Sequence, residues 1–246
     1  QTDSKNPDES MRDRPMCGMP ILWGMTETSP IGLAACLMPK HQSLTPEQRL
    51  MLEAKQGRPV YGMEFRVDGA DGKPITRDGK AFGAMMVRGP WVAAGYYNTS
   101  ESAAHEVPGW FNTGDVVTMD EDGFVQIVDR TKDVVKSGGE WISSIELENI
   151  AQAHPAVKEA AVVAKPDARW GERPVLVVVL KPGESFGRHE MVEHYTGRIS
   201  KWSIPDDVII VDELPHTATG KLLKTAIRDI VLKEYASVTP DDSIIG

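Results

Sequence analysis

The chain has 246 residues, of which 41% are hydrophobic, so it is long enough to bury one large core or two smaller ones. Its 27 basic and 36 acidic residues give a formal net charge of −9, which opposes binding to nucleic acid or to an anionic membrane surface. No apolar run approaches the roughly 20 residues that span a bilayer, so we expect a cytoplasmic protein that acts on small molecules.

The first 22 residues show no clear period, and the chain begins with Gln1 rather than Met. We therefore expect that upstream sequence is missing. Cys17 and Cys36 cannot form a disulfide framework and have no partners at metal-ligand spacing. Both are expected to be small buried apolar residues.

The first segment whose side chains could bind a ligand contains Trp23, Gly24, Met25, Thr26 and Glu27. Its glycine lets the backbone approach a ligand closely. The Thr26 hydroxyl can then donate to a phosphate, while Glu27 can hold Mg²⁺, a cation that takes oxygen ligands together with substrate phosphates. The alternative is a Ser/Thr-rich loop with a helix cap.

Residues 57–129 have the pattern of short strands separated by turns, for example at 64–68 and 84–88. Glycines that follow aspartates supply the positive φ of tight turns, at Gly72, Gly79 and Gly123. This pattern predicts a β-rich, barrel-like subdomain.

A second candidate, Asp115, ends the segment 109–115 directly after a Thr-Gly turn. An acidic side chain at a strand end can accept both hydroxyls of a ribose. In isolation Asp115 is also an ordinary turn residue.

The third candidate segment, 129–144, mixes charges with paired glycines. Arg130 can make a forked contact with ribose or phosphate oxygens, and the glycine pair lets a ligand pass close to the backbone. The alternative for its charged residues is a solvated linker. The candidate ligand contacts here are Arg130, Lys132, Lys136, Gly138, Gly139, Glu140 and Trp141.

From residue 130 onward the pattern alternates helices and strands. Ser143 and Glu146 have the spacing of a capping box, with Leu147, Ile150, Ala151 and His154 on one face of a helix that Pro155 ends. Strands are expected at 157–164, 174–180 and 208–211, and helices at 191–199 and from 222. The predicted fold class is α+β: residues 1–129 end a larger domain, and 130–246 form a small α+β domain joined by a hinge near 130–133.

The fourth candidate segment, 215–221, ends in Gly220 and Lys221. It is not a Walker motif, because Pro215 stands where the first glycine belongs and Leu222 replaces the Ser or Thr. It still predicts a loop that delivers one ammonium to a phosphate.

Taken in order, the four segments resemble the motifs of the acyl-adenylate-forming superfamily, which includes acyl-CoA synthetases, luciferases and the adenylation domains of peptide synthetases. The resemblance covers about residues 23–230. Residues 136–144 look most like the medium- and long-chain fatty acyl-CoA synthetase branch, and ligases for short thioether acids look similar there. The resemblance implies a carboxylic acid, ATP and CoA as substrates, with Mg²⁺, and acyl-AMP as the intermediate.

The same resemblance implies a role for each candidate. Thr26 would contact phosphate, Glu27 would hold Mg²⁺, and Trp23 would flank the adenine and the acyl pocket. Asp115 would bind the ribose and Arg130 the ribose or phosphate. Lys221 would bridge the carboxylate and the α-phosphate, Lys132 would be the hinge, and Gly139 with its neighbours would face pantetheine.

Two features depart from the family pattern. Trp23 stands where tyrosine is common, and the Ser/Thr/Gly-rich phosphate loop that lies upstream in the family is absent from the sequence. A missing amino-terminal portion is therefore expected. The alternatives are a non-catalytic module that binds AMP, CoA or a protein, and an adenylation domain that loads a carrier protein. Acyl chain length and oligomeric state, a homodimer included, stay open.

Overall fold

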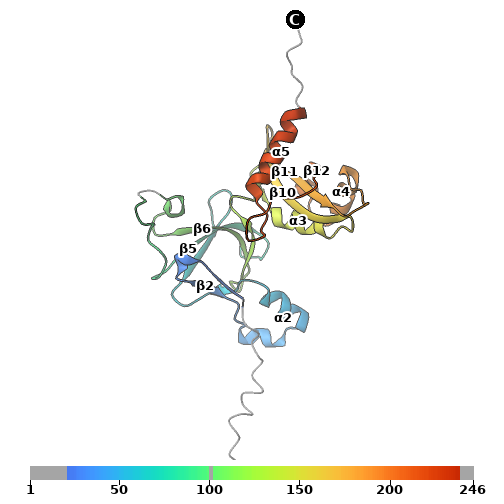
Figure 1. Ribbon diagram of the computed structural model, residues 1–246. Helices are drawn as coiled ribbons and strands as arrows, with labels where there is room; N and C mark the ends of the chain where they lie inside the picture. Colours follow the sequence, from blue (N-terminus) through green and yellow to red (C-terminus); the bar gives the residue numbers. More distant parts are fainter. Residues whose placement is uncertain (1–20, 100–101, 239–246) are drawn as a thin grey trace, which may run out of the picture. The chain divides into compact units, whose positions relative to one another are not determined.

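The computed structural model describes residues 21–99 and 102–238, and these form two compact units (Figure 1). The first unit contains the described residues up to 68, together with 74–113 and 117–127. The second contains 69–73, 114–116 and the described residues from 128 onward. Cys17 lies outside the described residues.

The first unit is built on two sheets. β1 (Leu22–Gly24), β2 (Ile31–Ala34) and β3 (Arg58–Pro59) form an antiparallel three-stranded sheet. β4 (Glu64–Asp68), β5 (Phe82–Arg88), β6 (Phe111–Met119) and β7 (Val125–Arg130) lie side by side in chain order. The predicted strand at 64–68 is confirmed, and the one at 84–88 lies within β5. The core of this unit contains Leu33, Phe65, Met85, Val87, Phe111 and Val117.

Turns and short helices connect these strands. Gly72, Gly79 and Gly123 have φ values of 73°, 71° and 80°, which confirms the predicted tight turns. The helical segments are η1 (Thr26–Thr28), η2 (Pro39–Ser43), α2 (Pro46–Glu53) and η3 (Ala103–His105). Helix α2 was not predicted, although Thr45 and Gln48 form a complete capping box around Pro46 at its first turn.

The second unit is a five-stranded sheet with helices on its faces. β8 (Val135–Ser137), β9 (Glu140–Ile142), β10 (Val157–Asp167) and β11 (Gly171–Leu180) follow the order β10-β11-β8-β9. β12 (Asp207–Ile210) pairs parallel with β11. The helices are α3 (Ser144–Gln152), α4 (Arg188–Tyr195), η4 (Lys201–Ser203) and α5 (Lys224–Val238).

Both faces of the central strands are apolar, because β10 and β11 alternate between two cores. Ala160, Val162 and Leu176 pack with Leu147 of α3 and Met191 of α4. The intervening residues Ala161, Val163 and Val177 pack with Ile227 and Val231 of α5. This two-sided burial explains the continuous apolar runs in the sequence. The mixed α+β class is confirmed.

Three details differ from expectation. Helix α4 ends at Tyr195 rather than near 199, because Gly197 adopts a φ of 80° two residues later. Helix α5 begins at Lys224 rather than 222, since Leu222 pairs with His216 in a turn. The expectation of a buried Cys36 was wrong, because Cys36 is exposed.

Within residues 21–99 and 102–238, no helix is both long and apolar enough to cross a bilayer.

Candidate functional site

The first candidate segment begins in strand β1 and turns into η1 through a network centred on Thr28. This buried hydroxyl accepts from the Met25 amide at 2.9 Å and lies 3.0 and 2.9 Å from the carbonyl oxygens of Met25 and Pro30. Gly24 is required here by a close backbone approach, because a Cβ would lie 1.7 Å from the Pro30 oxygen. Thr28, which the sequence analysis did not single out, therefore fixes the conformation of the segment.

Glu27 is oriented by a tyrosine from a distant part of the first unit. The Tyr96 hydroxyl donates to Glu27 Oε1 at 2.8 Å, and the Ala93 amide donates to the Glu27 carbonyl at 2.8 Å. The hydrogen bond to Glu27 raises the pKa of Tyr96, so the phenol keeps its proton and remains a donor. Neighbouring Thr26 is exposed. The half-buried Glu27 carboxylate therefore lies next to an exposed threonine, Thr26.

Trp23 lies inside the first unit, with 8% of its surface exposed. Its ring meets that of Phe65 edge to face, with centroids 5.9 Å apart. Met25 packs against the same core. The aromatic ring expected beside a ligand is thus mainly a core contact in this structure.

Asp115 and Arg130 form an ion pair on strands β6 and β7. Arg130 Nη1 lies 2.9 Å from Asp115 Oδ1, and the Asp115 side chain is 3% exposed while that of Arg130 is 55% exposed. The carboxylate is therefore anchored, whereas most of the guanidinium is open to solvent. The two residues expected to contact the nucleotide are adjacent.

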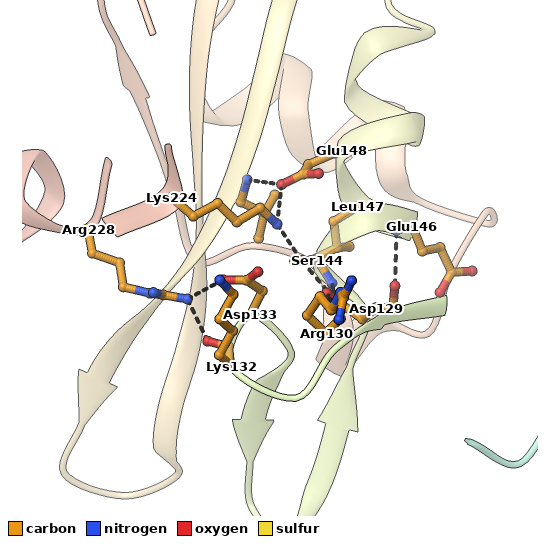
Figure 2. A network of polar contacts seen from close by, with 12 residues as sticks. Asp129, Arg130, Lys132, Asp133, Ser144, Glu146, Leu147, Glu148, Lys224 and Arg228 are labelled. Carbon is orange, nitrogen blue, oxygen red and sulfur yellow. Dashed lines mark hydrogen bonds and ion pairs between the residues drawn. The ribbon is translucent and has the colours of Figure 1, made fainter. Parts of the chain in front are cut away.

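A buried polar network surrounds Asp129 within the second unit (Figure 2). The Asp129 carboxylate accepts from the Arg130 amide at 2.7 Å, from the Ser144 amide at 2.5 Å and from the Ser144 hydroxyl at 2.8 Å. Lys224 Nζ in turn donates to Ser144 Oγ at 2.6 Å and lies 2.7 Å from Glu148 Oε1. Ser143 caps helix α3 by accepting from the Glu146 amide at 3.1 Å, which confirms the predicted helix start.

Lys132, the predicted hinge residue, is held through a hydrogen bond to its backbone carbonyl. Arg228 Nη2 donates to the Lys132 carbonyl and to Asp133 Oδ1, both at 2.6 Å. The Asp133 and Val134 amides both donate to the Arg130 carbonyl at 2.9 Å, so residues 130–134 form a tight turn. The Lys132 side chain itself is exposed.

The glycine pair forms the turn of the β8–β9 hairpin. Gly138 and Gly139 have φ values of 61° and 87°. A Cβ on Gly138 would lie 2.8 Å from the Trp170 ring, whereas one on Gly139 would meet no heavy atom within 4 Å. The Lys136 amide is fixed by Glu172 Oε2 at 2.7 Å.

Beside this hairpin lies a cavity of about 590 Å³ within the second unit. Its lining includes Gly138, Glu140, Trp170, Arg173 and Trp202. Trp141 is half-buried and sits outside this lining. Gly138 thus lines a cavity with aromatic walls, whereas Gly139 has no heavy atom near its Cβ position.

Lys221 lies on a hydrogen-bonded turn that precedes α5. The Thr217 amide donates to the Lys221 carbonyl at 2.7 Å, and the Lys221 amide donates to Thr217 Oγ1 at 3.2 Å. Gly220, at a φ of 79°, allows the chain to reverse. The side chain of Lys221 is exposed at the end of this turn.

The sequence-predicted residues therefore fall into groups. Trp23 to Glu27 belong to the first unit, and Asp115, Arg130 and all later candidates belong to the second. Five residues that hold the site were not predicted, because each has a contact with a residue 69 to 96 positions away in the chain: Tyr96, Ser144, Glu148, Lys224 and Arg228. Among residues 21–99 and 102–238 there is no group of three or more His, Cys, Asp or Glu side chains arranged to hold a metal.

Two family models match the chain. The model described as AMP-binding enzyme matches residues 6–97, and the model described as AMP-binding enzyme C-terminal domain matches residues 146–221.

Curated relatives are similar over most of the chain. The 3-methylmercaptopropionyl-CoA ligase of Ruegeria lacuscaerulensis is 48% identical over 84% of this chain and 38% of its own length. The medium-chain-fatty-acid–CoA ligase of Ectopseudomonas oleovorans is 44% identical over 88% of this chain and 40% of its own length. The chain thus spans 38–40% of the length of these relatives.

This chain is also similar to a solved structure of a coenzyme A synthetase. The o-succinylbenzoate coenzyme A synthetase of Bacillus subtilis, in complex with ATP and magnesium ion, matches with a TM-score of 0.65 and 31% identity. The match covers 85% of this chain and 41% of that one.

Proposed function

Because this chain belongs to the AMP-binding enzyme family, we propose that it supplies part of the active site of an AMP-forming acyl-CoA synthetase. In the first step a carboxylate oxygen attacks the α-phosphorus of ATP, pyrophosphate leaves and acyl-AMP forms. In the second step the thiol of CoA loses its proton and attacks the acyl carbon, and AMP leaves as the thioester forms. The domain limits 1–129 and 130–246, with the hinge near 130–133, are part of this proposal.

The Asp115–Arg130 pair carries the proposal. Its carboxylate is almost fully buried and ion-paired, so the side chain is held in one orientation before a ligand arrives. Such a carboxylate suits the two hydroxyls of a ribose. The exposed part of Arg130 then faces outward for ribose or phosphate oxygens.

Lys221 is proposed as the adenylation lysine. Its ammonium stands exposed on an ordered turn, which leaves it available to a developing negative charge at the carboxylate and the α-phosphate. A preorganised charge of this kind stabilises the transition state more than the ground state.

Glu27 and Thr26 fit a magnesium–phosphate role. Mg²⁺ typically takes one or two protein carboxylates and completes its shell with phosphate oxygens and water. Glu27 offers one carboxylate, held by Tyr96, next to the exposed hydroxyl of Thr26. When bound, the cation would neutralise charge on the pyrophosphate leaving group.

Fatty acids and 3-methylmercaptopropionate are the proposed substrate classes, because two relatives above 40% identity are named as ligases for them. Gly139 and the neighbouring hairpin residues are proposed to face the pantetheine arm of CoA.

The test measures AMP release with ATP, Mg²⁺, CoA and a panel of these acids. The chain is assayed alone and with the portion of the Ectopseudomonas ligase that it does not match. Lys221→Ala is expected to lower the rate of acyl-AMP formation by about 10² to 10³. Lys233→Ala, which removes an exposed charge from α5, is the matched control and should leave the rate unchanged. Normal acyl-AMP formation by Lys221→Ala would rule out the role given to Lys221.

Calorimetry with AMP separates this proposal from a module that only binds proteins. Asp115→Asn and Arg130→Ala are expected to weaken AMP binding. A module that only binds proteins would bind no AMP, either as the wild type or as a variant.

A further inference from the structure

Helix α5 is linked to the predicted hinge by two cations, directly through Arg228 and indirectly through Lys224 and Ser144. Lys224 and Arg228 are four residues apart, so they share one face of α5. Figure 2 shows Arg228 extended toward Lys132 and Asp133, and Lys224 extended toward Ser144 and Glu148. Both come from the helix that directly follows the Lys221 turn.

Arg228 fixes the part of the linker after the Cα atom of Lys132. It binds the Lys132 carbonyl and the Asp133 carboxylate at 2.6 Å each. The Lys132 carbonyl and the Asp133 amide belong to one planar peptide unit, which cannot twist internally. That unit therefore moves with α5, and a change of backbone direction is confined to the φ and ψ angles of Lys132 and to residues before it.

Lys224 acts on the part of the linker before Lys132, through Ser144. The Ser144 hydroxyl accepts from Lys224 and donates to Asp129, at 2.6 and 2.8 Å. Because this hydroxyl lies between an ammonium and a carboxylate, both of its hydrogen bonds are charge-assisted. Asp129 is 1% exposed, so water does not compete for its oxygens.

The two sets of contacts respond differently to rotation at Lys132. The partners of Arg228 lie on its own side of the rotating bonds, so those contacts persist. Asp129 lies before Lys132 and Ser144 lies after it, so rotation draws these two residues apart. The hydrogen bonds from the Asp133 and Val134 amides to the Arg130 carbonyl also join residues on opposite sides of Lys132.

We propose that the Asp129–Ser144 contact, backed by Lys224, is a latch that holds the linker in the conformation seen here and must open when the chain turns at Lys132. Ser144 and Lys224 are accordingly positioning residues for the two-step reaction. This inference rests on the proposed function, because only a two-step enzyme needs the turn.

Hydrogen–deuterium exchange of the chain measures how often the latch opens and requires no enzymatic activity. Ser144→Ala removes the hydroxyl and keeps the amide contact to Asp129, and it is expected to speed amide exchange across residues 130–134 about tenfold. Asp129→Asn, a second variant of unchanged shape, should do the same. Ser200→Ala, at an exposed serine, is the control. Exchange at the wild-type rate in both latch variants would overturn the proposal.

Half-reaction rates give the second readout, using the chain together with the unmatched part of the relative. A weakened latch is expected to change the ratio of acyl-AMP formation to thioester formation from supplied acyl-AMP by at least about threefold. An equal loss in both steps would make Ser144 a purely structural residue and would overturn the latch. If the wild type performs neither step, the proposed function fails, and the exchange measurement still decides the latch.

Discussion

Lys224 and Glu148 form a buried ion pair whose fate on mutation can be anticipated from solvation. The two side chains are 14% and 12% exposed, and Glu148 also accepts from the Val162 amide at 2.8 Å. Burial raises the pKa of the Glu148 carboxyl above its usual value, and the adjacent ammonium opposes that rise. The charge of Lys224 is therefore needed to keep the carboxylate ionised inside the second unit.

Lys224→Met is expected to lower the free energy of unfolding by about 3–5 kcal/mol near neutral pH, because it leaves a buried carboxylate without its partner. Its pH dependence has a defined sign. Without Lys224 the pKa of folded Glu148 rises further above that of the unfolded chain, so the folded state binds the proton more tightly and the loss shrinks as pH falls. Urea unfolding should show a smaller deficit at about pH 5 than at about pH 8. A deficit that grows toward low pH would contradict this account.

At the scale of the elements, the β8–β9 hairpin contains two glycines that look equivalent in sequence and differ in surroundings. Gly138→Ala adds the cost of a left-handed backbone, about 1–2 kcal/mol, to a contact of 2.8 Å with the Trp170 ring. Gly139→Ala adds the backbone cost alone. Chemical denaturation of the two variants should therefore give the larger loss for Gly138→Ala. Equal losses would show that Trp170 moves away without cost.

The elements were predictable where a local pattern dominates. Ser143 begins α3 as its spacing to Glu146 indicates, and the strand at 64–68 alternates as a half-buried strand should. Helix α2 carries an equally local signal in Thr45, Pro46 and Gln48.

The site was predictable only in part, because its motifs are local and its supports are not. Asp115, Arg130 and Lys221 stand out by their immediate neighbours in the sequence. Lys224 reaches Ser144 across 80 positions and Arg228 reaches Lys132 across 96, so only the fold brings these pairs together. The packing of Trp23 was equally hidden in the sequence, because a tryptophan in a motif suits a ligand contact as well as a core.

At the scale of the whole molecule, each unit has a core of its own, so we expect unfolding to depart from a single two-state transition. Met85 and Leu176 are both fully buried, one in each unit. Met85→Ala and Leu176→Ala should each remove about 2–5 kcal/mol from the unit that contains the residue. Differential scanning calorimetry should then show one transition shifted and the other retained. A single transition that both variants shift equally would indicate that the two cores unfold together.

The turn that carries Lys221 has an entropic consequence. Hydrogen bonds across residues 215–223 already order its backbone, including that from the Leu223 amide to the Pro215 carbonyl at 2.8 Å. Ordering a flexible loop costs about 1–2 kcal/mol per residue, and this turn incurs that cost once, during folding. In the proposed reaction, an approach of the ammonium to a phosphate would freeze only the rotamers of one side chain. For the proposed role of Lys221, the loss of freedom in each cycle is then that of a single lysine side chain.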